Sequence, residues 1–278
     1  MARDDLSRPR RTVAARGGRN LLLRRDGRCQ NRAVSDGVRI LTAGDQGIVV
    51  EFGDSIDPDV NARVRRLARA ITARLGGEII EVVPTYRSLL VLHDPLQLHR
   101  TRLLQRIQTI LAELPEGTAE PPGRAVHLPA CYGGAFGPDL EAVARHAGLT
   151  PAEVVALHSG ATYLVYMLGF TPGFGYLGGM PARLAMPRLD TPRPHVHPGS
   201  IGIAGLQTGI YPVKSPGGWR IIARTPARLF DPSASSPFLL APGDRVRFEP
   251  IETPAFEEIA ARVAAGGYEP RIEPGSAA

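Results

Sequence analysis

The chain has 278 residues, of which 43% are apolar, enough to build the core of one large domain or of two ordinary ones. No apolar run approaches the roughly 18 residues that cross a membrane, and two cysteines provide no disulfide framework. The net charge of +6 belongs to residues 1–36, which hold 10 Arg and 4 Asp, while the rest of the chain carries 23 basic and 23 acidic residues. We therefore expect a protein of the reducing cytoplasm with no membrane partner and no nucleic-acid partner, because the latter needs a basic face on a folded domain.

The first 37 residues differ in composition from the sequence that follows them. They are rich in arginine and show no apolar periodicity, which is typical of disorder. The first strand-like segment begins at Val38. We predict a disordered basic tail over residues 1–37 and interpret it as a dispensable extension or a translation-start artefact.

Residues 38–118 are predicted to form a compact α/β domain. Its expected elements are a strand at 48–52, a helix at 58–75, strands at 79–83 and 88–92, and a helix at 103–114. Asp57 before Pro58 predicts the start of the first helix, with aspartate as its cap and proline in its first turn. This order is most of a ferredoxin-like unit, and residues 126–129 either supply its last strand or begin the next domain.

A proline- and glycine-rich linker at 115–123 separates this unit from a second domain over 124–253. Two short helices come first, one after Gly137-Pro138-Asp139 and one opened by the capping box Thr150-Pro151-x-Glu153. Short β segments are then predicted at 162–168, 200–204, 208–211, 219–224 and 245–249. Many short strands with Gly/Pro turns predict a barrel or a sandwich. Residues 254–278 are predicted to be a terminal helix, centred on 257–263, and a tail.

The segment from Gly169 to Gly218 combines 11 Gly and 8 Pro in 50 residues with large apolar side chains that require burial. A shortage of such side chains is what disorder needs, so the segment predicts constrained turns between short strands. Gly173 to Gly178 matches G-x-G-x-x-G, but a dinucleotide site needs a helix there, and Gly179 and Pro181 oppose one. We therefore expect these turns to hold backbone amides and a few polar side chains around a binding site.

Two groups in this segment are candidates for chemistry. The neutral amide of Gln207 offers a donor and an acceptor to an amide-like ligand, or alternatively ties down a turn. The run Ser215-Pro-Gly-Gly-Trp219 brings together a hydroxyl, the free amides of Gly217 and Gly218, and an aromatic wall, or alternatively forms a tight turn with Trp219 in the core.

Other polar residues give weaker signals. His158, near a helix end, is either a base facing a ligand or a satisfied structural residue. His195-x-His197 has no third ligand nearby, so we predict no metal site. No serine lies in a G-x-S-x-G elbow, which argues against hydrolysis by a serine nucleophile.

Several long motifs resemble the 5-oxoprolinase B-subunit family, also called the allophanate hydrolase subunit 1 or Kip kinase-inhibitor family. They include Gln207-Thr-Gly-Ile-Tyr-Pro212, Ser215-Pro-Gly-Gly-Trp219, Arg224-Thr-Pro226, Tyr166-Met-Leu-Gly-Phe170, Leu229-Phe-Asp-Pro232 and Pro242-Gly-Asp-Arg-Val-Arg-Phe248. The resemblance covers about residues 38–251. It implies an α+β protein in which a ferredoxin-like domain is followed by a cyclophilin-like β-barrel.

The resemblance also implies a function and a site. It predicts the B-subunit of a bacterial ATP-dependent 5-oxoprolinase, which opens the lactam of 5-oxoproline to glutamate with a C-subunit of related barrel fold and a separate A-subunit. ATP is then used by the complex, with no site located in this chain and no metal or covalent cofactor. The residues expected to act are Gln207 and Ser215 as catalytic groups, and Tyr211, Gly217, Gly218, Trp219, Phe174 and His158 as substrate-binding groups.

Two alternatives remain open, because all three share the fold. One is the carboxyltransferase part of a urea carboxylase or allophanate hydrolase pathway, with a urea-like substrate and any biotin on another chain. The other is a Kip-like inhibitor of a sensor histidine kinase.

Overall fold

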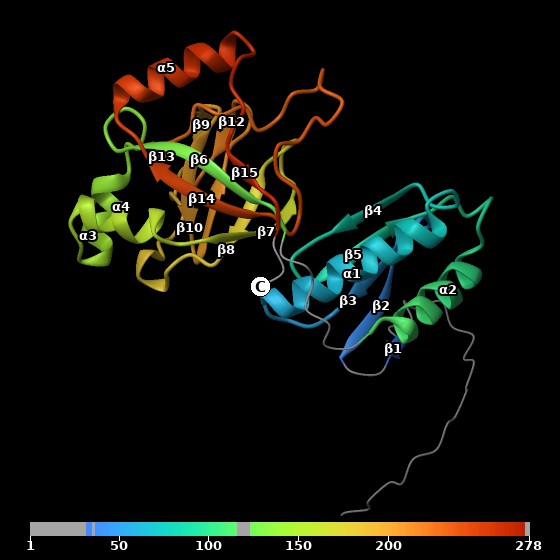
Figure 1. Cartoon of the computed structure of the whole chain (residues 1–278). Coiled ribbons are helices and arrows are strands. Elements are labelled where there is room, and N and C mark those ends of the chain that lie inside the picture. Colours follow the sequence, from blue (N-terminus) through green and yellow to red (C-terminus); the bar gives the residue numbers. More distant parts are fainter. Residues whose placement is uncertain (1–31, 35–36, 116–122, 276–278) are drawn as a thin grey trace, which may run out of the picture.

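In the computed structural model, residues 32–34, 37–115 and 123–275 are described, with side chains from residue 37 onward. They form an N-terminal α/β unit and a β-barrel that lie side by side (Figure 1). The predicted disordered tail stays a prediction for the residues outside these ranges, whereas residues 32–34, which also lie within it, form a strand. The linker, of which 116–122 lie outside the described residues, also stays a prediction.

The first unit is a five-stranded antiparallel sheet with strand order β1-β2-β3-β5-β4. Its elements are β1 (Arg32–Val34), β2 (Val38–Ala43), β3 (Gly47–Glu51), α1 (Pro58–Leu75), β4 (Glu81–Pro84), β5 (Ser88–Leu92) and α2 (Arg100–Glu113). The start of α1 is confirmed, since Asp57 Oδ1 accepts hydrogen bonds from the Asp59 and Val60 amides at 2.8 and 3.2 Å. Apolar side chains of both helices and of the sheet form one core, including Ile48, Leu67 and Ile107.

The strand beside β3 in this sheet is β2, which precedes it in the chain. Residues 126–129 lie instead in β6 of the barrel, so the second of the two options for this segment holds. The four strands β2 to β5 and the two helices agree with an α+β class; the ferredoxin-like name for this unit stays a prediction.

The second unit contains a closed seven-stranded barrel, in the order β13-β10-β11-β8-β7-β14-β6 with β6 returning to β13. Its strands are β6 (Ala125–Tyr132), β7 (Tyr163–Leu168), β8 (Gly175–Gly178), β10 (Ser200–Ala204), β11 (Gln207–Ile210), β13 (Arg220–Arg224) and β14 (Arg245–Pro250). Only β14 and β6 pair in parallel. The interior is filled by apolar side chains such as Val126, Ile201 and Phe248.

Further elements surround the barrel. They are α3 (Leu140–Ala147), α4 (Pro151–Ser159), η1 (Ala182–Leu184), the ribbon of β9 (Arg193–Val196) and β12 (Ser215–Gly217), α5 (Thr253–Ala264) and β15 (Ile272–Glu273). The capping box of α4 is confirmed, because Thr150 and Glu153 exchange both expected hydrogen bonds. The glycine motif at 173–178 contains β8, a barrel strand, and starts no helix. Among the described residues, no helix is both long and apolar enough to cross a membrane.

Candidate functional site

Most of the predicted site residues lie on the outer face of the barrel wall, because side chains of β11 alternate between its two faces. Thr208 and Ile210 point inward, where Thr208 bonds to His158 and Ile210 joins the barrel core. Gln207, Gly209 and Tyr211 therefore share the outer face. This alternation decides which of the predicted residues lie on the same face of the barrel wall.

Two paired glycines leave neighbouring positions on this outer face without side chains. Gly202 of β10 pairs with Gly209 of β11. A Cβ atom at Gly209 would lie 2.9 Å from the rings of both Phe174 and Trp219, and one at Gly202 would lie 3.0 Å from Trp219 Cβ. The absence of side chains at the two positions thus allows the aromatic rings to pack directly against the barrel wall.

The aromatic rings that pack against these two glycines form one buried cluster. The centroid of Phe174 lies 5.1 Å from that of Tyr211 and 5.5 Å from that of Trp219, both nearly perpendicular, and Tyr176 lies 6.0 Å from Trp219. Such edge-to-face arrangements are favourable for aromatic pairs. The structure thus brings together three predicted substrate-binding residues and adds Tyr176, which is half-buried.

The run from Ser215 to Trp219 lies along the same cluster. Gly217 approaches Tyr211 so closely that a Cβ there would lie 2.5 Å from the Tyr211 hydroxyl oxygen. Gly218 accepts a hydrogen bond from the Leu189 amide at 2.7 Å. Ser215 is buried, and its Oγ has no hydrogen-bond partner in the described part of the chain. A buried hydroxyl without a partner carries a cost that a ligand can remove.

Gln207 lies where the barrel meets the first unit. Its Nε2 atom and the hydroxyl of Tyr86 are both buried without a partner at hydrogen-bonding geometry among the described residues. The two side chains nevertheless lie close to each other, since Gln207 acts through hydrogen bonding on the pKa of Tyr86. The Gln207 amide and the Tyr86 hydroxyl, which can donate and accept, therefore lie together where the two units meet.

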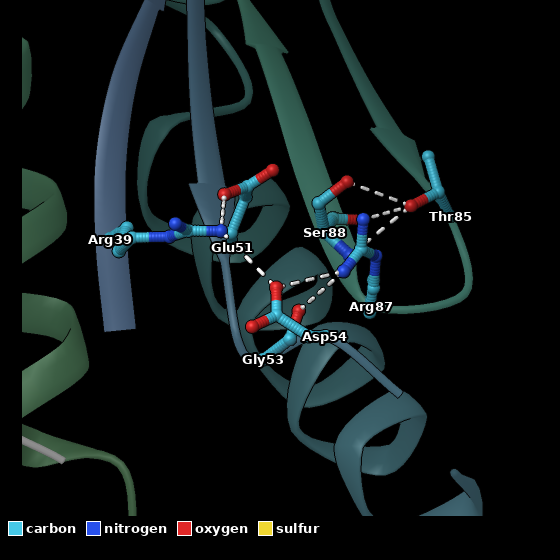
Figure 2. A network of polar contacts seen from close by, with 7 residues as sticks. All are labelled: Arg39, Glu51, Gly53, Asp54, Thr85, Arg87 and Ser88. Atoms are coloured by element: carbon cyan, nitrogen blue, oxygen red, sulfur yellow. Dashed lines mark hydrogen bonds and ion pairs between the residues drawn. The ribbon is translucent and has the colours of Figure 1, made fainter. Parts of the chain in front are cut away.

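Tyr86 is carried by the turn between β4 and β5, and polar contacts fix the shape of that turn (Figure 2). The Thr85 amide and Oγ1 donate to the Ser88 carbonyl at 2.8 and 3.0 Å. Arg87 donates to the Gly53 carbonyl at 3.1 Å and to Asp54 at 3.0 Å. The turn thus holds the Tyr86 ring 5.6 Å from Tyr166 and 5.7 Å from Tyr176, measured between centroids.

Asn61 of α1 joins this turn to the barrel. Its fully buried Nδ2 lies 3.0 and 3.2 Å from the carbonyl oxygens of Thr85 and Tyr86, and 3.3 Å from that of Tyr166 in β7. Its Oδ1 accepts from Arg65. One side-chain amide therefore sets the position of the turn relative to the barrel strand.

Arg188 brings a positive charge to the cluster. Its exposed guanidinium lies 5.9 Å from the Trp219 ring centroid, and no carboxylate pairs with it within the described ranges. Burial raises the pKa of Tyr86, Tyr176 and Tyr211, and the charge of Arg188 opposes each rise. The three hydroxyls stay protonated near neutral pH and act as hydrogen-bond donors.

His158 lies on the other side of the wall, inside the barrel, and is not brought together with the other predicted residues. Its Nδ1 is 2.8 Å from the Tyr132 hydroxyl and its Nε2 is 3.1 Å from Thr208 Oγ1, while its ring stacks on Phe248. Burial lowers the pKa of His158 to about 3. The imidazole is therefore neutral and fully hydrogen-bonded.

This burial predicts a pH-dependent stability. Below the ordinary histidine pKa of about 6.5 the unfolded chain binds a proton that folded His158 excludes, so stability falls as pH decreases, by about 1.4 kcal/mol per pH unit. Between pH 6.5 and 4.5 we expect wild type to lose about 2–3 kcal/mol more than His158→Gln in urea unfolding. The exposed His146→Gln should keep the wild-type slope. Equal slopes for wild type and His158→Gln would contradict a buried, neutral imidazole.

Phe170 marks a strained turn at the edge of the aromatic cluster. It has φ 61°, is 61% exposed, and sits at the centre of a γ-turn in which the Thr171 amide donates to the Gly169 carbonyl at 2.6 Å. Its ring lies edge-on to Phe174 and Tyr211 at 5.6 and 6.5 Å. A left-handed, exposed phenylalanine is unfavourable for folding alone, so this position points to function.

Relief of this strain gives a second prediction. Phe170→Gly should raise the free energy of unfolding by about 1 kcal/mol, because glycine adopts positive φ without the Cβ penalty. Phe170→Ala keeps a Cβ atom and should give no such gain. Urea unfolding of the three proteins measures the difference, and equal or lower stability of Phe170→Gly relative to Phe170→Ala would show that the turn is unstrained.

Five residues of this site were not predicted from the sequence: Asn61, Tyr86, Phe170, Tyr176 and Arg188. Tyr86 and Asn61 belong to another unit, and no local pattern connects them with Gln207. Phe170 stands within a motif that carries the family resemblance, but its backbone conformation is visible only in the structure.

Comparisons with known proteins bear on the family and the fold of the chain. The family model described as carboxyltransferase domain, subdomain C and D, matches residues 38–240. In fold, the chain is similar to the crystal structure of Kluyveromyces lactis urea carboxylase, with a TM-score of 0.69 and 22% identity over 85% of this chain and 24% of that one. The family model identifies a carboxyltransferase-type domain, and the structural match shows that the fold is shared.

Two further relatives are more similar in sequence. The 5-oxoprolinase B-subunit of Bacillus subtilis (strain 168) is 43% identical over 215 residues, which cover 74% of this chain and 89% of the relative. The crystal structure of TTHA0988 has a TM-score of 0.68 and 41% identity over 75% of this chain, which spans only 41% of that longer chain. The chain belongs to the 5-oxoprolinase B-subunit family, which confirms the resemblance predicted from its motifs.

Proposed function

We propose that this chain is the B-subunit of an ATP-dependent 5-oxoprolinase complex, which opens the lactam of 5-oxoproline to glutamate together with a C-subunit, of related barrel fold, and a separate A-subunit. Relatives that carry the 5-oxoprolinase B-subunit name, at 41–43% identity over 89–95% of their own length, support the assignment. The structural observation that carries it is the buried Nε2 of Gln207, which has no partner at hydrogen-bonding geometry among the described residues and lies close to Tyr86, whose ring packs against Tyr176.

The arrangement suits an amide substrate. A lactam opens when water adds to its carbonyl carbon, the C–N bond breaks, and the nitrogen takes a proton, so negative charge develops on the carbonyl oxygen. The Gln207 Nε2 donates to that oxygen and stabilises the charge in a site from which water is largely excluded. Trp219, Tyr211 and Phe174 form the apolar wall, and the Gly217 and Gly218 backbone lets a small ring approach it.

Ser215 has a supporting role in this proposal. Its buried Oγ lacks a partner in the described residues and orients the ligand by accepting or donating one hydrogen bond. We assign His158 to the barrel interior, where it holds Thr208 and thereby the register of β11 beneath Gln207.

ATP enters the proposal only at the level of the complex. Hydrolysis of ATP supplies the driving force for a ring opening that is uphill near neutrality. The glycine motif that most resembles a nucleotide loop forms strand β8 in this chain, so its residues do not fit a phosphate-binding turn. We therefore assign ATP to another protein of the complex and place the barrel face of this chain at its junction with the C-subunit.

The test is ATP-dependent release of glutamate from 5-oxoproline by the other two proteins of the complex, with and without this chain. The proposal expects turnover only when the chain is present. Equal turnover without it would refute the assignment.

The alternative function follows from the family model, which is a carboxyltransferase domain. In that case the chain would transfer a carboxyl group to a urea-like substrate from biotin on another chain. Carboxylation of urea by this chain together with a biotin carboxylase would favour that alternative.

A further inference from the structure

Three polar groups lie near one another where the two units meet. They are the Tyr86 hydroxyl and the Gln207 Nε2, both buried and unpartnered among the described residues, and the exposed guanidinium of Arg188. They come from a turn of the first unit, from β11, and from the segment between η1 and β9. Their common location suggests a single ligand.

The three groups surround one pair of rings. Tyr86 lies 5.7 Å from Tyr176, Tyr176 lies 6.0 Å from Trp219, and the Arg188 guanidinium lies 5.9 Å from Trp219. The Tyr86 hydroxyl and the Arg188 guanidinium therefore belong to groups that contact the same two rings, and the charge of Arg188 also reaches Tyr86. A small, flat ligand at these rings has a donor and a cation in its surroundings.

We propose that the site is built across both units and recognises a cyclic amide that carries a carboxylate: Tyr86 donates beside Gln207 to the ligand carbonyl oxygen, and Arg188 binds the carboxylate. A guanidinium is the preferred partner of a carboxylate because it presents a planar fork of donors. A protonated tyrosine hydroxyl is an effective donor to a carbonyl oxygen that gains charge.

This inference rests on the proposed function in taking 5-oxoproline as the ligand, since that molecule has a lactam carbonyl and a carboxylate on one small ring. It adds that Arg188 determines specificity and that the first unit takes part in binding. It also explains why the Tyr86 turn is held so firmly by Asn61 and Arg87.

The chain contains a reporter for the test, because Trp219 is its one tryptophan and lies in the site. Fluorescence titrations of the full chain with 5-oxoproline and with 2-pyrrolidinone, which lacks the carboxylate, measure both affinities. We expect Arg188→Gln to weaken 5-oxoproline at least about tenfold while 2-pyrrolidinone changes less than about twofold. Tyr86→Phe should weaken both ligands by a similar factor, about three- to tenfold.

Matched variants exclude general damage. Arg145→Gln, at an exposed position of α3, and Tyr268→Phe, beside α5, should bind both ligands as wild type does. No saturable change with 5-oxoproline in wild type, or equal loss of both ligands in Arg188→Gln, overturns the inference. Failure of the complex to release glutamate refutes the proposed function but not carboxylate recognition, which the titration decides independently.

Discussion

Gln207→Ala is expected to reduce ATP-dependent glutamate release by the reconstituted complex at least about 100-fold, as the loss of a donor to a developing oxyanion does in other enzymes. The folded chain itself should be unaffected. The Gln207 Nε2 lies close to Tyr86 but outside hydrogen-bonding geometry among the described residues, so its removal deletes no strong contact of that kind. The free energy of unfolding should therefore change by less than about 0.5 kcal/mol.

The matched control is Gln105→Ala, at an exposed position of α2, which should leave turnover and stability at wild-type values. Steady-state rates of glutamate release and urea unfolding together separate the two effects. Wild-type turnover by Gln207→Ala would rule out its role. Loss of turnover with a parallel loss of stability would show that Gln207 ties down the β10–β11 turn instead.

Asn61→Ala is expected to have the largest effect on stability, lowering the free energy of unfolding of the first unit by about 2–3 kcal/mol. The substitution leaves the carbonyls of Thr85, Tyr86 and Tyr166 without the amide that binds them at 3.0–3.3 Å. It also removes the acceptor that Arg65 uses on this side chain. Buried polar groups that lose a partner carry their full desolvation cost.

Two probes make this prediction specific to the junction. Trp219 fluorescence reports the barrel, whereas far-UV circular dichroism also reports α1 and α2 of the first unit. In urea we expect coincident transitions for wild type, and for Asn61→Ala a circular dichroism transition that moves to lower urea while the fluorescence transition stays. Thr72→Ala, at an exposed position of α1, should behave as wild type. Unchanged, coincident transitions in Asn61→Ala would contradict the role given to this residue.

Elements whose structure is decided by local chemistry were predicted correctly from the sequence. The Asp57 cap with Pro58 and the capping box at Thr150 both begin helices as predicted, because a few adjacent residues satisfy the exposed amides of a helix start. Strands with alternating or β-branched residues, such as β3 and β10, were also predicted. Strands β8, β9 and β12 were missed, since Gly and Pro interrupt their patterns and only barrel pairing or ribbon pairing holds them.

Only the part of the site that the barrel contributes was predicted from the sequence. Gln207, Tyr211 and Trp219 lie close together in the sequence, and the motifs around them carry the family resemblance. Tyr86 lies more than a hundred residues earlier and reaches Gln207 through packing of the two units, which no sequence period encodes. His158 was proposed at this site, but the two-residue alternation of β11 places its partner Thr208 on the inner face.

The most direct test of the proposed site is a crystal structure of the full chain with 5-oxoproline. We expect one ligand against Tyr176 and Trp219, its lactam oxygen within hydrogen-bonding distance of Gln207 Nε2 and the Tyr86 hydroxyl, and its carboxylate on Arg188. A ligand bound elsewhere on the chain, or one whose lactam oxygen faces away from Gln207, would contradict a lactam site at this face of the barrel.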